Sequence, residues 1–203
     1  MDDSLFRSIN RFADRTAWLH PFATAYANWG IGLFAVLLLA AWWAARSAED
    51  PPLAVAAVVW AGAASLIGAL GVQLIGAPID RARPTAMLAG THLLIDRTTD
   101  FSFPSDHTTA TAAIAVGLLL AGTRLRQRWH GRVALALCLL MAVDRVYVGA
   151  HYPTDVVAGF ALGSTVAVVL ARPATKLIGL VVARLGETPL RPVVFATERS
   201  APV

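Results

Sequence analysis

Five residues between positions 83 and 155 have the types and spacing that phosphoryl transfer needs. His151 and Asp155 are four residues apart, so the carboxylate can hold one ring nitrogen while the other acts as a nucleophile. His107 can protonate a leaving oxygen as a general acid. Arg83 and Arg145 can each bind phosphate oxygens through paired, charge-assisted hydrogen bonds. Together these residue types predict a metal-free phosphoryl-transfer site.

Two proline-containing dipeptides predict helix starts near these side chains. Pro104-Ser105 and Pro153-Thr154 each place proline where it suits the first turn of a helix. The first N–H groups of a helix lack partners and, with the helix dipole, attract an anion. The Ser105 hydroxyl can bind that anion or serve only as a helix cap. The helix starts therefore add phosphate-binding groups to those of the arginines.

A zinc site is the alternative for the histidine and carboxylate pair. His151 and Asp155 are ligand types that zinc accepts. No third ligand lies at a helpful spacing, however, and the two arginines nearby would repel the ion. We therefore expect no metal and no other cofactor.

The order of these residues resembles the three-part signature of the type-2 phosphatidic acid phosphatase superfamily. That signature reads K-x6-R-P, then P-S-G-H, then S-R-x5-H-x3-D. The matching residues here are Arg83-Pro84, then Pro104-Ser105-Asp106-His107, then Asp144-Arg145 followed by His151 and Asp155. The order and spacing of three separate parts make a chance match very improbable.

The resemblance implies a role for each matching residue. His151 would be the nucleophile that forms a phosphohistidine, Asp155 would orient it, and His107 would be the acid. The phosphate-binding set would comprise Arg83, Ser105, the amide of Asp106, and Arg145.

Three positions depart from the signature. Gly76 stands where the family has lysine, Asp106 replaces glycine, and Asp144 replaces serine. Arg81 is the candidate substitute for the missing lysine as a phosphate ligand. Asp144 can instead form a structural ion pair with its neighbour Arg145, and either aspartate can tune protonation. The P-S-D-H form and the stretch DRARP are most similar to the undecaprenyl-diphosphatase branch.

The elements that position these residues are predicted to be membrane helices. Of 203 residues, 57% are hydrophobic and 15% are charged, whereas soluble domains are about a quarter charged. Residues 16–45 and 51–79 contain no Asp, Glu, Lys or Arg. Each stretch exceeds the roughly 20 residues that a helix needs to cross the hydrocarbon core. The composition therefore predicts an all-α, polytopic membrane bundle.

Hydrophobic runs and charges set the expected boundaries. We expect one domain over residues 1–185 and a basic tail over residues 186–203. The domain would open with an interfacial amphipathic helix over residues 2–16. Five spans would follow at about residues 24–45, 53–76, 105–122, 133–150 and 153–171.

The distribution of arginine predicts the orientation of the chain. The loop between the third and fourth spans contains Arg124, Arg126, Arg128 and Arg132 without an acidic residue. The positive-inside rule places such a loop in the cytoplasm. The three motifs would then face the outer side of a bacterial cytoplasmic membrane. The net charge of +4 fits membrane lipids as partners and not nucleic acid, and the sequence leaves the oligomeric state open.

The expected function is that of a lipid phosphatase. The resemblance implies hydrolysis of undecaprenyl diphosphate to undecaprenyl phosphate, which recycles the lipid carrier of cell-wall synthesis. Alternative substrates are phosphatidylglycerophosphate, phosphatidic acid or a polyprenyl-phosphosugar. A lipid-dependent phosphotransferase is a second alternative. A third is a non-enzymatic membrane protein with a decayed site, which the missing lysine at Gly76 favours.

Overall fold

The computed structural model describes residues 1–125 and 128–196, and the regular elements in this part of the chain are all helices. In chain order they are α1 (Asp2–Arg15), η1 (Ala17–Leu19), α2 (His20–Trp29), α3 (Ile31–Ala45), α4 (Pro51–Ile79), α5 (Pro84–Met87), α6 (Asp106–Ala121), α7 (Trp129–Tyr147), α8 (Pro153–Val169), α9 (Ala171–Leu185) and α10 (Arg191–Val194). This arrangement confirms the all-α prediction. The last residues of the predicted tail, 197–203, and Arg126 of the arginine loop lie outside the described residues.

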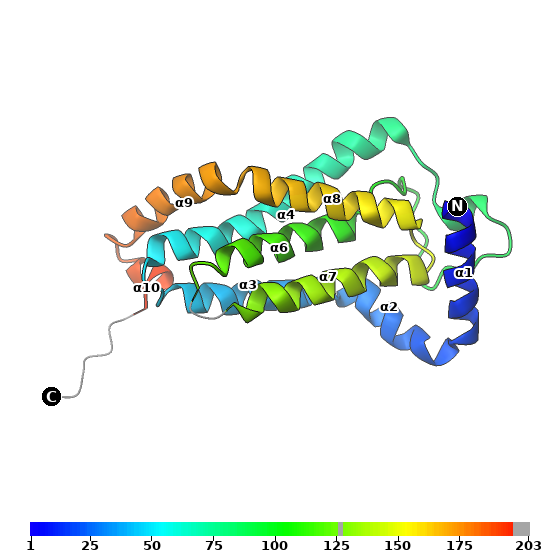
Figure 1. The fold of residues 1–203 in the computed structure, drawn as a ribbon, viewed down its shortest axis with the longest axis horizontal. Coiled ribbons are helices and arrows are strands. Elements are labelled where there is room, and N and C mark those ends of the chain that lie inside the picture. The colour runs from blue at the N-terminus through cyan, green and yellow to red at the C-terminus, as the bar shows by residue number, and fades with distance from the viewer. Residues whose placement is uncertain (126–127, 197–203) are drawn as a thin grey trace.

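Helix α6 is the centre of the bundle and packs against α4, α7 and α8 (Figure 1). Small residues allow the closest of these contacts. A Cβ atom on Gly159 of α8 would lie 2.5 Å from the Ser105 carbonyl oxygen, and one on Gly163 would lie 2.1 Å from that of Thr109. Close approach at small residues is how membrane helices gain packing energy. It also holds the middle of α8 against the first turn of α6.

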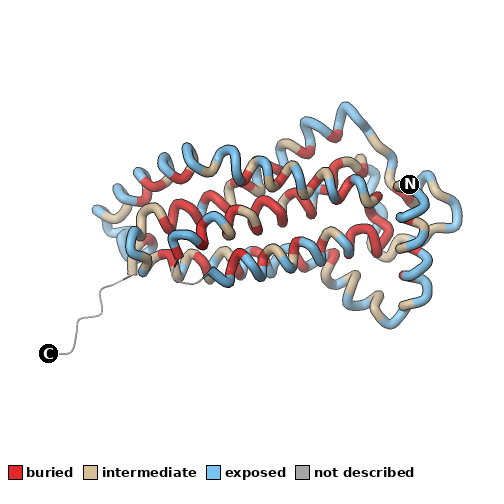
Figure 2. The backbone as a smooth tube through the Cα atoms, in the orientation of Figure 1, coloured by how far each residue is buried: buried red, intermediate tan, exposed pale blue. Residues whose placement is uncertain are grey.

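Apolar side chains cover much of the outside of the bundle. Leu66, Leu70 and Leu74 form a stripe along α4 and are 70%, 65% and 78% exposed. Figure 2 shows buried residues along the inner faces of the long helices and exposed ones outside. A stripe of exposed leucines at this spacing suits lipid as the surrounding solvent.

The helices that can cross a membrane include one long segment and two pairs that are bent where they join. By length and hydropathy, one segment, Pro51–Met87, can cross a membrane by itself. Two bent helix pairs also qualify if each pair counts as one span. One joins Ala17–Trp29 to Ile31–Ala45 with a bend of 56°, and the other joins α8 to α9 with a bend of 55°. The second bend follows from Pro173, which has no N–H and whose ring crowds the carbonyl four residues back, at Val169. Helix α6 is apolar but shorter.

Helix α1 lies across one end of the bundle, roughly at right angles to the long helices (Figure 1). Phe6 on its inner face is fully buried. The Asn10 side chain exchanges two hydrogen bonds with the His92 backbone, donating to the carbonyl at 2.8 Å and accepting from the N–H at 2.9 Å. These contacts fix α1 over the loop that precedes α6.

Candidate active site

The motif residues meet at the end of the bundle that α1 covers, where α7 ends and α6 and α8 begin (Figure 1). His151 lies in the short connection between α7 and α8 and is 1% exposed. Its N–H donates to the Arg145 carbonyl at 3.2 Å. Gly149 makes the turn with φ +84°, and a Cβ there would lie 2.3 Å from the His92 carbonyl oxygen. A glycine is therefore required two residues before His151.

One hydrogen bond determines the tautomer of His151. Its Nδ1 lies 2.7 Å from the Ser102 carbonyl oxygen, and because a carbonyl can only accept, Nδ1 carries the proton. The lone pair is then on Nε2, which lies 3.4 Å from Nη1 of Arg83. Burial lowers the pKa of His151, so the ring is neutral at neutral pH. Nε2 is therefore available as a nucleophile.

The Asp155 carboxylate reaches His151 through Ser102. Its Oδ2 accepts hydrogen bonds from Ser102 Oγ at 2.5 Å and from the Tyr152 N–H at 2.9 Å. The same oxygen lies 3.8 Å from His151 Nδ1, which is too long for the direct hydrogen bond that the spacing predicts. Asp155 thus fixes Ser102, and the Ser102 carbonyl holds the imidazole.

Sequence reasoning did not identify Ser102. The residue is fully buried, and its N–H donates to the Arg81 carbonyl at 2.7 Å. It lies outside the three signature parts, and its only signal is its place two residues before Pro104.

The link that Ser102 forms between Asp155 and His151 predicts a loss of activity when Ser102 is substituted. Ser102→Ala removes one hydrogen-bond donor to a buried carboxylate. We expect kcat/KM to fall by about 10- to 100-fold as a result. We expect the loss in kcat, with KM little changed, because the hydroxyl orients the nucleophile and does not bind substrate. Ser65→Ala is the matched control, since that hydroxyl donates to a carbonyl of its own helix. Full activity of Ser102→Ala would contradict this link.

Arg83 lies directly beside the reactive nitrogen. Besides facing His151 Nε2, its Nη1 donates to the Ala150 carbonyl at 3.0 Å, and its Nη2 pairs with Asp100 at 2.9 Å. The Arg83 side chain is 12% exposed. Its guanidinium is therefore held in place at the point where an incoming phosphate would meet His151.

The guanidinium of Arg81 binds Asp155, Thr154 and Asp2. Nη1 contacts Asp155 Oδ1 at 2.6 Å and Thr154 Oγ1 at 2.8 Å, and Nη2 contacts Asp2 Oδ2 at 2.6 Å. Its guanidinium also lies 3.9 Å from the centre of the Tyr152 ring. The structure therefore places the predicted phosphate ligand in a link between α1 and Asp155.

Packing explains the missing lysine at position 76. A Cβ on Gly76 would lie 2.0 Å from Cε2 of Phe101 and 2.6 Å from the Phe103 carbonyl oxygen. A side chain there would displace the segment that carries Ser102. Gly76 is thus required by the loop that holds the imidazole.

The start of α6 brings the second motif to the site. Ser105 is fully buried and caps α6, its Oγ accepting from the Thr108 N–H at 3.4 Å. Asp106 Oδ1 accepts from His107 Nδ1 at 3.0 Å and lies 3.8 Å from His151 Nε2. The carboxylate that replaces the motif glycine therefore lies between the two histidines.

Arg145 lies in the last turn of α7, directly after Asp144 in the sequence. Arg145 is 5% exposed, and its Nε has no hydrogen-bond partner in the described part of the chain. The charged groups that interact with Arg145 are Asp106, Arg83, Asp144 and Asp100, and three of these four belong to the site. Consecutive helical residues diverge by about 100°. Within residues 1–125 and 128–196 no ion pair joins Asp144 to Arg145.

Comparison with known proteins identifies the family of the chain. The family model described as the PAP2 superfamily matches residues 54–178, a range that contains every predicted site residue. The chain belongs to the PAP2 superfamily. The match covers more than half of the chain and all three signature parts.

Two curated relatives and one solved structure resemble the chain over most of its length. The chain is 30% identical to the undecaprenyl-diphosphatase BcrC of Bacillus subtilis (strain 168), over 84% of this chain and 80% of that protein. It is 29% identical to the bacitracin transport permease protein BcrC of Bacillus licheniformis, over 85% and 80%. A transmembrane PAP2-type phosphatidylglycerolphosphate phosphatase from Bacillus subtilis superposes with a TM-score of 0.62 at 21% identity, covering 86% of each chain.

Family and fold together place this PAP2 protein among integral membrane enzymes. It is an all-helical lipid phosphatase, a phosphate-ester hydrolase, as the sequence motifs predict. The exposed apolar stripe on α4 and the spans described above agree with that membrane location.

Proposed function

We propose that this PAP2 phosphatase hydrolyses undecaprenyl diphosphate to undecaprenyl phosphate and inorganic phosphate. The observation that carries the chemistry is the buried His151, with its proton fixed on Nδ1 and its lone pair facing Arg83. The choice of substrate rests on the undecaprenyl-diphosphatase BcrC of Bacillus subtilis, which matches over 84% of the chain. The substrate is thus a polyprenyl diphosphate lipid taken from the membrane.

The first chemical step forms a phosphohistidine. His151 Nε2 attacks the terminal phosphorus, and the bond from that phosphorus to the bridging oxygen breaks. His107 donates a proton to the bridging oxygen, which leaves on undecaprenyl phosphate. Its Nδ1 is held by Asp106 at 3.0 Å, so the proton that it donates comes from Nε2.

The second step regenerates the enzyme. His107, now deprotonated at Nε2, takes a proton from water, and the resulting hydroxide oxygen attacks the phosphohistidine phosphorus. The N–P bond breaks, its electron pair returns to His151 Nε2, and inorganic phosphate leaves. Substrate and one water are thereby converted to lipid monophosphate and phosphate.

Positive groups around the phosphate stabilise charge in both steps. Arg83 and Arg145 contribute two guanidinium groups, and the start of α6, capped by Ser105, adds its dipole. Arg145 is buried, and its Nε has no hydrogen-bond partner among the described residues, as expected for a group that binds an anion. Arg81 supports the site indirectly by holding Asp155.

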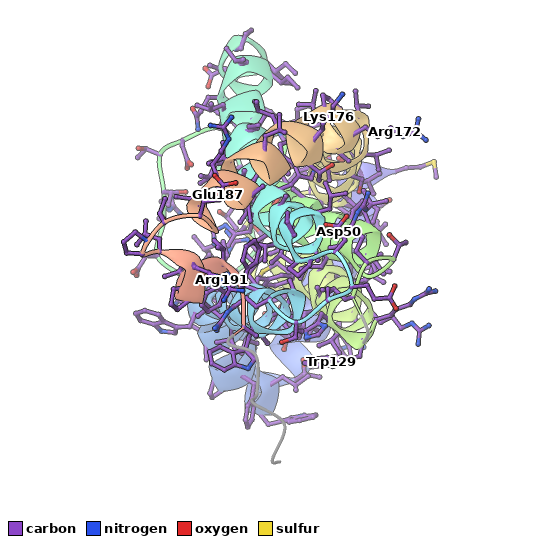
Figure 3. All side chains as sticks on the ribbon, turned by 90° about the vertical axis from the view of Figure 1, so that its left-hand side faces the viewer. Asp50, Trp129, Arg172, Lys176, Glu187 and Arg191 are labelled. Carbon is purple, nitrogen blue, oxygen red and sulfur yellow. The ribbon has the colours of Figure 1, made fainter. Side chains whose placement is uncertain are left out.

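The site would face the outside of a bacterial cytoplasmic membrane. The view onto the opposite end of the bundle shows Arg172, Lys176 and Arg191 together with Asp50 and Glu187 (Figure 3). Basic residues favour the cytoplasmic side, and acidic residues contribute little to orientation. Helix α1 would then lie in the outer interface. A single phosphatase domain over residues 1–185 is consistent with this arrangement.

Substrate preference tests the proposal. The purified protein is expected to release phosphate from undecaprenyl diphosphate with a kcat/KM at least about tenfold above that for phosphatidylglycerophosphate or phosphatidic acid, a preference of roughly 1.4 kcal/mol. Phosphate release without an added acceptor distinguishes hydrolysis from phosphotransfer. A preference for phosphatidylglycerophosphate would transfer the assignment to the activity named for the superposed Bacillus structure.

The pH dependence of kcat/KM reports the state of His151. Only the neutral imidazole is nucleophilic, and burial lowers the pKa of His151, so the nucleophile stays active below the ordinary histidine value of about 6.5. We expect the acidic limb of the kcat/KM profile to fall below that pH. An acidic limb above about pH 6.5 would contradict a buried, neutral nucleophile.

A further inference from the structure

A cavity that is open to the outside of the bundle lies against α7, on the side of that helix that faces α1 and α2. Its volume is about 390 Å³. We call it the α2–α7 cavity. Its lining includes Phe12 of α1, Phe22 and Tyr26 of α2, and Leu140, Val143 and Asp144 of α7. The volume lies within the range of small-molecule sites, roughly 300–1,000 Å³.

Asp144 is the polar exception in this apolar lining. The residue is 6% exposed, and its Oδ2 has no hydrogen-bond partner among the residues that the structure describes. The nearby Tyr26 hydroxyl donates to the Leu137 carbonyl at 2.7 Å instead. Arg145, the neighbour of Asp144 in the sequence, forms no ion pair with it in the described part of the chain. A buried carboxyl oxygen without a donor is costly and uncommon.

The lining suits one kind of ligand. An ammonium group carries a compensating charge and up to three N–H donors for the carboxylate. The rings of Phe12, Phe22 and Tyr26 line the same space, and aromatic faces attract cations as well as apolar chains. A ligand with a cationic head and an apolar chain therefore matches both the carboxylate and the walls.

We propose that the α2–α7 cavity binds a cationic amphiphile, with its ammonium group on Asp144 and its apolar chain among the rings of α1 and α2. The cavity is distinct from the phosphate site, because its lining includes none of Arg83, Arg145 and His151. The proposed ligand binding does not depend on which lipid the phosphatase hydrolyses.

Binding of dodecylammonium to the full chain in phosphatidylcholine nanodiscs tests the proposal. Dodecanol and dodecyl sulfate, which have the same chain length, are the comparison probes. Titration calorimetry is expected to show one saturable dodecylammonium site per chain, with an affinity at least about tenfold above that for either probe. Equal binding of dodecanol would overturn the proposal, because the chain alone would then account for affinity.

Two variants and a control locate the site. Asp144→Asn is nearly isosteric and is expected to remove the preference for dodecylammonium. Leu140→Trp fills the cavity and is expected to weaken dodecylammonium binding while Asp144 is retained. Glu49→Gln, an exposed carboxylate outside the cavity lining, should bind like the native chain. Unchanged dodecylammonium affinity in Asp144→Asn would place the cation elsewhere and refute the assignment.

Discussion

His151→Ala is expected to lower kcat/KM for phosphate release by roughly 10⁴-fold or more, the scale seen when a covalent nucleophile is removed. The change deletes Nε2, which lies 3.4 Å from Arg83 Nη1 and is the only ring nitrogen of His151 with a free lone pair. Water cannot replace it in a two-step reaction. Steady-state phosphate release from undecaprenyl diphosphate measures the loss.

A trapping experiment shows whether the loss is chemical. Rapid acid-free quenching of the native enzyme with terminally labelled substrate should yield a base-stable, acid-labile phosphoprotein, which His151→Ala should lack. His92→Ala is the matched control, because that imidazole is 64% exposed and outside the site. If His151→Ala keeps near-native turnover, or if the native enzyme gives no labelled protein while turning over, the phosphohistidine mechanism is wrong.

Arg83→Ala is expected to reduce kcat/KM by about 10²- to 10³-fold, the typical effect of removing one charge-stabilising donor. The guanidinium is anchored by Asp100 and by the Ala150 carbonyl, so it meets the phosphate without reorganising. Inhibition by inorganic phosphate should weaken in parallel, since the same contact binds the product. Phosphate inhibition constants measured beside kcat and KM test both expectations.

The Arg81→Ala variant distinguishes the role of Arg81 from that of Arg83. Both terminal nitrogens of Arg81 are paired with Asp155 and Asp2, so its loss should disturb the position of Asp155 and the docking of α1. We expect lower kcat and a lower unfolding temperature, with phosphate inhibition close to native. If Arg81→Ala weakens phosphate inhibition as much as Arg83→Ala does, Arg81 is the phosphate ligand that replaces the motif lysine.

Much of this protein can be read from local sequence. Charge-free stretches longer than a membrane span require helices in lipid, because a backbone without water must satisfy its hydrogen bonds internally. The spacing of Arg145, His151 and Asp155 places three functional groups within one helix end, one turn and the next helix start. Such short-range geometry depends on the chain alone.

Contacts between segments that are far apart in the chain could not be predicted from the sequence. Ser102 and Asp155 are 53 residues apart, yet they share the hydrogen bond that positions His151. The direction of Arg81 depends on Asp2, 79 residues away. No local sequence pattern specifies which groups a long, flexible side chain will contact in the folded protein.

The sequence by itself determined the helical membrane class, the motif residues and the type of chemistry. Only the tertiary structure decided that Arg83 and not Arg81 faces the nucleophile, that Ser102 links Asp155 to His151, and that Gly76 leaves no room for lysine. The physical reason is that residue type and spacing fix what a group can do. Its partner depends on packing between helices that only the folded bundle brings together.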